Sequence, residues 1–180
     1  RLVNNKSYIP FYMKKEKVYN IPWKNDNKIR TTHPLDCFSH LNELQNMDKN
    51  HFCLTQSSIL TLMGIRPNDD LDIIVSSAIR NKLRLGNKYV RSGNVEIFSP
   101  NYDKFMIFGV KDDDDLINNF TFEFEGYKFL EPRFYFSRKN KKTSKDLNDW
   151  KLIKDFFEKG KHLGYPFHNL SEEQLGIKYL

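Results

Sequence analysis

The sequence predicts a small α/β (α+β) domain in which a mixed β-sheet is flanked by helices. Two patterns support this fold class: candidate helices and strands alternate in the first part of the chain, and candidate strands then cluster in its middle third. A chain of 180 residues is long enough for one domain. With 39% hydrophobic and 29% charged residues, its composition also argues against the disordered and fibrous classes.

The cellular location is predicted from apolar runs, the number of cysteines and the lack of a secretory signal. No apolar run approaches the roughly 20 residues that a membrane-spanning helix needs. The two cysteines are too few for a disulfide scaffold, and with no secretory signal they favour the reducing cytoplasm. Because the sequence begins with Arg1 rather than Met, we expect a piece of a longer protein.

The domain organisation is read from a change in pattern near Pro34. Residues 1–33 are polar and irregular, with scattered prolines and aromatic residues, and we expect an N-terminal arm or edge segment there. Residues 34–180 carry the regular hydrophobic periodicity of a folded domain.

The first half of this domain alternates helices and strands. Pro34 suits the first turn of a helix, Gly64 suits a helix end, and Ser76 or Ser77 can cap a helix. Short apolar and β-branched runs favour strands. The expected elements are a helix over 34–44, a strand over 52–55, a helix over 57–63, a strand over 71–75 and a helix over about 77–85.

The second half begins with clustered strands and ends in helices. Gly93 and Pro100 separate the strands, Thr143 or Ser144 caps the longest helix, and Gly160 ends it. That helix is expected to place Leu147, Trp150, Ile153, Phe156 and Phe157 on one face. The expected elements are strands over 88–91, 95–98 and 105–110, a short helix or loop from 112, a hairpin over 120–130, a helix from 132, the long helix to 160 and a short helix from 171.

Asp70 and Asp72 are the strongest candidates for chemistry. Residues i and i+2 of a strand point to the same face, with α-carbons about 6.5–7 Å apart. At about 4 Å and an effective dielectric constant near 20, two carboxylates repel by roughly 4 kcal/mol, so that one takes up a proton or a cation lies between them. Oxygen ligands favour Mg²⁺ or Mn²⁺. The alternative is a strand end whose aspartates reach solvent.

Ser57 adds a candidate phosphate contact to this pair. It lies 13 residues before Asp70, at the expected start of a short helix. A helix start offers free N–H groups and a positive dipole end to a phosphate. A strand, a turn that binds phosphate, a helix and a strand with two metal-binding carboxylates together make a coherent nucleotide site.

This order of motifs resembles the nucleotidyltransferase superfamily, the polymerase-β-like fold. Its small members carry a glycine–serine turn, a short helix often followed by Gly-Ile-Arg, and Asp-x-Asp on a strand. The resemblance implies that Asp70 and Asp72 bind the catalytic metals and that Ser57 contacts the triphosphate. The matching segments are Gln56-Ser57, Gly64-Ile65-Arg66 and Asp70-Leu71-Asp72-Ile73. Gln56 stands where the family has glycine, which leaves open altered donor binding or a degenerate site.

The family also places a third carboxylate on a neighbouring strand, where it binds the metal that activates the acceptor hydroxyl or acts as the base. Glu96 is the best candidate, because apolar residues flank it on both sides. The alternative for Glu96 is an outward-facing position on an alternating strand. The weaker rivals are Asp103, Glu123 and Glu125.

Two basic residues are candidate donor contacts. Arg66 lies just before the Asp-x-Asp strand, where it can meet the triphosphate or pair with Asp69. Lys145 opens a segment that resembles the Lys-Asp…Asp start of the closing helix in small members, which implies a phosphate contact. The alternative is an ordinary helix start, in which the following Asp146 needs only the helix dipole. The family's arginine two residues before the lysine is replaced by Thr143.

The function expected from these residues is metal-dependent nucleotidyl transfer from a nucleoside triphosphate to a small-molecule or glycan acceptor. An alternative is a phosphotransferase of glycan assembly with a CDP-linked donor, because residues 67–72 partly resemble the Pro-Trp-Asp-Asp-Asp-Ile-Asp motif of that class, without its tryptophan. The net charge of +6 suits nucleic acid, but the aromatic residues are not interleaved with the basic ones. A non-catalytic scaffold is the remaining alternative, motivated by Gln56.

Overall fold

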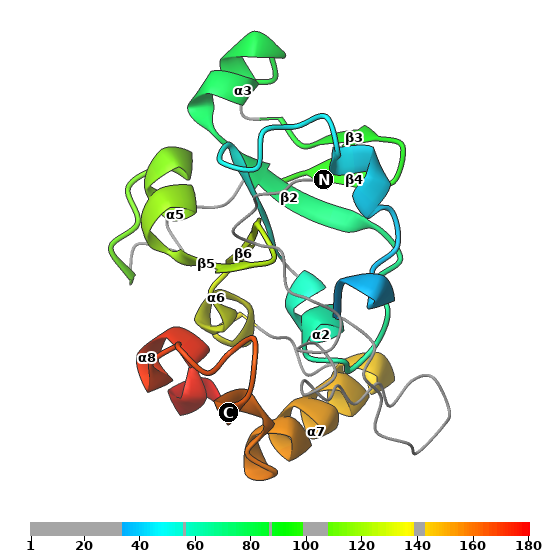
Figure 1. Ribbon diagram of the computed structural model, residues 1–180, viewed down its shortest axis with the longest axis vertical. Helices are drawn as coiled ribbons and strands as arrows, with labels where there is room; N and C mark the ends of the chain where they lie inside the picture. Colours follow the sequence, from blue (N-terminus) through cyan, green and yellow to red (C-terminus); the bar gives the residue numbers. More distant parts are fainter. Residues whose placement is uncertain (1–33, 56, 87, 99–107, 139–142) are drawn as a thin grey trace, which may run out of the picture.

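The computed structural model describes residues 34–55, 57–86, 88–98, 108–138 and 143–180 (Figure 1). They form an open, six-stranded mixed β-sheet with helices, which confirms the predicted fold class. The predicted arm over 1–33, the residues Gln56 and Asp103 and the first part of the strand expected at 105–110 lie outside the described residues.

The sheet has the strand order β3-β4-β2-β1-β6-β5. Two antiparallel hairpins, β3–β4 and β5–β6, form its edges, and β1 and β2 pair antiparallel at its centre. The pairs β2–β4 and β1–β6 are parallel, which makes the sheet mixed. The strands are β1 (Phe52–Leu54), β2 (Leu71–Val75), β3 (Val90–Ser92), β4 (Val95–Ile97), β5 (Thr121–Phe124) and β6 (Tyr127–Leu130).

The helices begin at the capping residues that the sequence indicates. Ser76 Oγ accepts a hydrogen bond from the N–H of Ile79, and Thr143 forms a capping box with Asp146. The α-helices are α2 (Ser58–Leu62), α3 (Ser77–Lys82), α5 (Asp113–Asn119), α6 (Pro132–Phe136), α7 (Ser144–Glu158) and α8 (Glu172–Leu175). The 3₁₀ helices are η2 (Pro34–Cys37), η3 (Leu41–Leu44), η5 (Lys161–Leu163) and η6 (Ile177–Tyr179).

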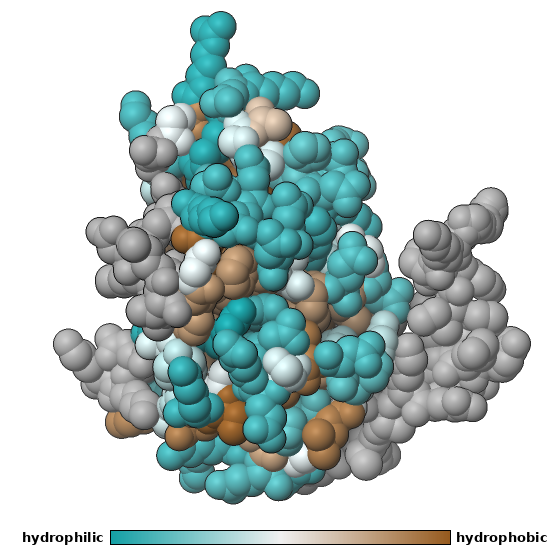
Figure 2. All heavy atoms as spheres, turned by 90° about the vertical axis from the view of Figure 1, so that its left-hand side faces the viewer, coloured by the Kyte–Doolittle hydropathy of each residue, from teal (hydrophilic) through white to brown (hydrophobic). Residues whose placement is uncertain are grey.

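Each face of the central strands packs against its own hydrophobic cluster, because successive strand residues point to opposite faces. On one face, Ile73 and Val75 pack with α2 and α7. On the other face, Ile74 packs with residues of α5 and α6. Asp70 and Asp72 share the parity of Ile74, so both lie on this second face, towards the start of β2. Figure 2 shows that hydrophilic side chains cover most of the face it displays, with apolar atoms in smaller groups between them.

Four sequence-based expectations are wrong in detail. The helix over 34–44 is two 3₁₀ helices, because His40 adopts a left-handed φ of 71° between them. Helix α3 ends at Lys82, and Arg84 follows with φ of 55°. Leu147 is 55% exposed rather than on the core face of α7. Residues 108–110 are not in a strand.

A search of the described residues finds no helix whose length and apolar character would suffice for crossing a membrane.

Candidate metal centre

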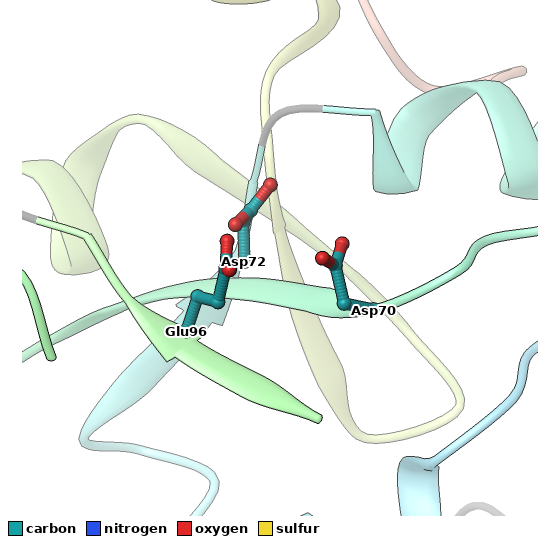
Figure 3. A group of neighbouring side chains, drawn as sticks. All are labelled: Asp70, Asp72 and Glu96. Carbon is teal, nitrogen blue, oxygen red and sulfur yellow. The ribbon is translucent and has the colours of Figure 1, made fainter. Parts of the chain in front are cut away.

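Three carboxylates converge where strands β2 and β4 run side by side. Asp72 is the direct cross-strand partner of Glu96 in the parallel β2–β4 pair, and Asp70 lies two residues earlier on the same face of β2. Each of the three residues offers an oxygen, and these oxygens all lie within 4.8 Å of one another (Figure 3). The structure therefore brings together the three residues that the sequence nominates as metal ligands.

Asn68 holds the start of β2 in place. Its side chain is buried, with Oδ1 accepting from the N–H of Ser39 at 2.8 Å and Nδ2 donating to the carbonyl of Ser39 at 2.9 Å. Nδ2 also donates to the carbonyl of Asp70 at 3.1 Å. These bonds fix the backbone of Asp70 and, with it, the direction in which the Asp70 carboxylate leaves the strand.

Glu43 fixes the hairpin that carries Glu96. The turn of this hairpin contains Gly93, whose φ of 60° suits glycine. Glu43 accepts hydrogen bonds from the backbone N–H and the side-chain amide of Asn94, both at 3.0 Å, and these bonds lower the pKa of Glu43. The carbonyl of Asn94 in turn accepts from the N–H of Leu71 at 2.9 Å. The hairpin is thereby held against the start of β2.

Edge strand β3 brings two further groups to the carboxylates. Arg91 lies opposite Glu96 in the β3–β4 pair. Its guanidinium forms an ion pair with Glu96, and Nη1 also lies 3.6 Å from Oδ2 of Asp70. Tyr89 is hydrogen-bonded to Glu96, and this bond raises the pKa of Tyr89 to about 12 because the carboxylate stabilises the protonated phenol.

The electrostatics of the cluster favour one retained proton. Burial raises the pKa of Asp72 to about 7, with further contributions from its hydrogen bond to Glu96 and the nearby charge of Asp70. The pKa of Glu96 is lowered, first by the hydrogen bond from Tyr89, then by the one from Asp72, and also by Arg91. The Asp72 carboxyl group is thus the donor and Glu96 the acceptor of their shared bond.

The spacing of the three carboxylates fits a divalent cation. Mg²⁺ binds oxygen at about 2.0–2.1 Å, so that two ligands on opposite sides of the ion are about 4.1 Å apart. The 4.8 Å limit on the spread of the three oxygens therefore requires at most small side-chain adjustments. Two ions about 3.5–4 Å apart, sharing carboxylates, are also compatible with this spread.

The start of α2 lies next to the strand that carries the carboxylates. The N–H of Thr55 donates to the carbonyl of Asp72 at 2.9 Å, which continues the β1–β2 pairing one residue beyond β1. Ser57 follows two residues later at the N-cap position of α2, and its side chain makes no capping hydrogen bond. The predicted order of strand, turn, helix start and carboxylate strand is therefore present in three dimensions.

Arg66 and Lys145 do not join this group within the described part of the chain. Arg66 pairs with Asp149 of α7, with Nε 3.2 Å from Oδ1, rather than with Asp69. Lys145 is exposed in the first turn of α7. In Figure 1, α7 lies below α2, whereas β2 and β4 lie above it. Donor contacts by Arg66 and Lys145 remain predictions.

The rival third carboxylates lie elsewhere in the sheet. Glu123 is on β5, at the opposite edge of the sheet from the β3–β4 hairpin. Glu125 accepts a hydrogen bond from the hydroxyl of Tyr165 at 2.8 Å. Of the described candidates, Glu96 alone forms a cluster with Asp70 and Asp72.

Four residues around the carboxylates are not nominated by the sequence analysis: Asn68, Glu43, Arg91 and Tyr89. For Arg91 a signal exists, because a two-residue Gly-Asn turn between alternating residues is typical of a tight hairpin. That turn places Arg91 opposite Glu96. The hydrogen bonds of Asn68 and Glu43 join residues 29 and 51 positions apart, and no local pattern indicates them.

Comparisons with protein-family models, with curated proteins and with solved structures give no match for this chain. Its resemblance to the nucleotidyltransferase superfamily consequently rests on the motif residues themselves. The cross-strand pairing of Asp72 with Glu96 is a further observation, because it comes from the register of β2 and β4.

Proposed function

We propose that this protein is a metal-dependent nucleotidyltransferase that moves a nucleoside monophosphate from a nucleoside triphosphate to a small-molecule or glycan acceptor. The observation that carries the proposal is the convergence of Asp70, Asp72 and Glu96 from two neighbouring strands, with oxygens within 4.8 Å. The start of α2 beside the same strand supports it, because that is where a triphosphate would need backbone and hydroxyl donors.

In this proposal Asp70, Asp72 and Glu96 hold Mg²⁺ or Mn²⁺. The metal would polarise the transferred phosphoryl group, activate the acceptor hydroxyl and stabilise the leaving pyrophosphate. The hydroxyl of Ser57, which does not cap α2, would donate to a phosphate of the donor. Gln56 precedes Ser57 in the sequence, and its role in donor binding stays a prediction.

The proposed donor is a nucleoside triphosphate, a CDP-linked compound is the alternative donor, and nucleic acid is a less favoured partner. The cytoplasmic location that we propose rests on the small number of cysteines, of which Cys37 and Cys53 are both buried.

Calorimetric titration tests the proposal directly. The four ribonucleoside triphosphates and CDP-choline are each titrated with and without Mg²⁺. We expect metal-dependent binding of a donor in the wild type, and its loss in Asp70→Ala and Asp72→Ala. The exposed neighbour Asp69, changed to Ala, serves as the matched control with the same loss of charge.

Three outcomes decide between the alternatives. Selective binding of CDP-choline would transfer the proposal to a CDP-donor phosphotransferase. Nucleotide affinity that is unchanged in both Asp70→Ala and Asp72→Ala, in proteins with native circular dichroism, would contradict the assignment. Absence of binding by the wild type would support a non-catalytic scaffold instead.

A further inference from the structure

Arg91 is the cationic side chain that the described structure places directly on the carboxylate cluster. Its guanidinium contacts Glu96 and lies 3.6 Å from Asp70, so it reaches two of the three candidate metal ligands. Its Nε also donates to the carbonyl of Gly93 at 3.1 Å. A guanidinium in this place partly neutralises the same oxygens that a divalent cation would need.

The position of Arg91 permits movement. It lies on β3, the edge strand of the sheet, and its side chain is 50% exposed, whereas the Glu96 side chain is 14% exposed. Half-exposed ion pairs are weak, so that only a modest free energy holds the guanidinium in place. The side chain can therefore leave the carboxylates while β3 stays paired with β4.

A divalent cation and this guanidinium compete for the cluster. Both bind carboxylate oxygens, and like charges a few ångströms apart repel each other strongly in a partly buried site. Cation binding to Asp70 and Glu96 would therefore displace the Arg91 head group outwards. The displaced guanidinium would remain close to any phosphate that the cation binds.

An arginine suits this second position. Its planar, forked donors match phosphate oxygens in a bidentate arrangement, which a lysine does not reproduce. Arg66, the arginine that the sequence favours for this role, is paired with the buried Asp149. The described structure thus offers Arg91 as the better-placed phosphate contact.

We propose that Arg91 is a built-in counter-cation of the Asp70–Asp72–Glu96 cluster, which a divalent cation displaces and which then contacts a phosphate of the donor. The inference rests on the proposed function, because it requires a metal-bound phosphate at the same carboxylates. It adds a competition between Arg91 and the metal, and it assigns the donor contact to β3 rather than to the helices.

Mn²⁺ and inorganic triphosphate are the probes for the experiment, since triphosphate lacks a base and is independent of donor identity. Mn²⁺ binding is followed by electron paramagnetic resonance without phosphate, and triphosphate binding by calorimetry at saturating Mg²⁺. The variants are Arg91→Ala, Arg91→Gln as a larger polar replacement, and Arg91→Lys. Lys82→Gln, an exposed charge loss on α3, is the matched control.

In Arg91→Ala and Arg91→Gln we expect Mn²⁺ to bind about tenfold more tightly, because two weak competing ion pairs are removed. Triphosphate should bind about tenfold more weakly in the same two variants. Arg91→Lys should retain the wild-type Mn²⁺ affinity and lose several-fold in triphosphate affinity. Lys82→Gln should change neither affinity appreciably.

Either unchanged Mn²⁺ affinity or unchanged triphosphate affinity in folded Arg91→Ala and Arg91→Gln would overturn the inference while leaving the metal site itself intact. Failure of both the wild type and Arg91→Ala to bind Mn²⁺ would instead overturn the proposed function, and the inference with it. The two failures are therefore distinguishable. An unfolding curve for each variant verifies that edge strand β3 tolerates the substitution.

Discussion

Replacing Arg66 with alanine separates a structural role of this residue from a role in donor binding. Arg66 follows α2 and pairs with Asp149 of α7, so the two residues join segments 83 positions apart in the sequence. The Asp149 side chain is 4% exposed and that of Arg66 is 22% exposed. Arg66→Ala therefore leaves a buried carboxylate without its cation.

The expected loss of stability in Arg66→Ala follows from the burial of Asp149. Removing one partner of a fully buried ion pair costs about 3–5 kcal/mol, because the other charge stays desolvated. Arg66 is partly exposed, and Asp149 makes at least one further interaction, so we expect the smaller loss of about 2 kcal/mol in the free energy of unfolding. Asp149→Asn in the Arg66→Ala background should recover part of this loss, since it removes the buried carboxylate charge.

Urea unfolding monitored by tryptophan fluorescence measures the stability, with the buried Trp150 next to Asp149 as a reporter. Nucleotide affinity is measured in parallel at low temperature, where Arg66→Ala remains folded. We expect a clear shift in the unfolding midpoint with nearly unchanged affinity. A wild-type midpoint combined with a tenfold loss of affinity would refute the structural reading and restore Arg66 as a donor contact.

Two further predictions concern the carboxylate strand. The pKa of Asp72 is raised to about 7, so the native state holds a proton that the unfolded state releases near pH 4. In EDTA, the free energy of unfolding of the wild type should therefore fall by about 2 kcal/mol as the pH rises from 4.5 to 7.5, after allowance for solvent screening. Asp72→Asn should remove this fall. If the wild type and Asp72→Asn showed the same dependence of stability on pH in EDTA, the prediction would be wrong. Asn68→Ala should cost about 1–3 kcal/mol in urea unfolding, because it removes the three hydrogen bonds that the buried Asn68 side chain makes to Ser39 and Asp70. Asn68→Ala should also weaken Mn²⁺ binding through Asp70, and wild-type Mn²⁺ affinity would show that the Asn68 bonds do not orient that carboxylate.

Much of the carboxylate cluster is predictable, because it depends on strand parity. Asp70 and Asp72 are two residues apart in an apolar, β-branched run, and this spacing alone places them on one face. Glu96 is flanked by the apolar residues of another short strand, and the structure pairs it directly with Asp72. Local sequence patterns do not indicate which strands are neighbours. The expectation that the strand of Glu96 lies beside that of Asp72 therefore depends on the family resemblance.

The contacts that hold the cluster in place are not predictable in the same way. The bonds of Asn68 to Ser39 and of Glu43 to Asn94 join distant segments, and each depends on the packed arrangement of η2, η3 and the β3–β4 hairpin. Local patterns also fail where one residue departs from its expected conformation. His40 in the left-handed region divides the expected helix over 34–44 into two short turns.

The cluster is energetically costly for the fold, and this cost favours a functional reading over a structural one. Three carboxylates within 4.8 Å repel one another, and the structure offsets this repulsion with the proton on Asp72 and the contacts of Glu96 with Arg91 and Tyr89. Ile74 lies two residues after Asp72 on the same face of β2. It is fully buried in an apolar cluster and causes no charge repulsion. An aliphatic residue at position 72 would serve stability better, so we infer that the carboxylate there is retained for what it binds.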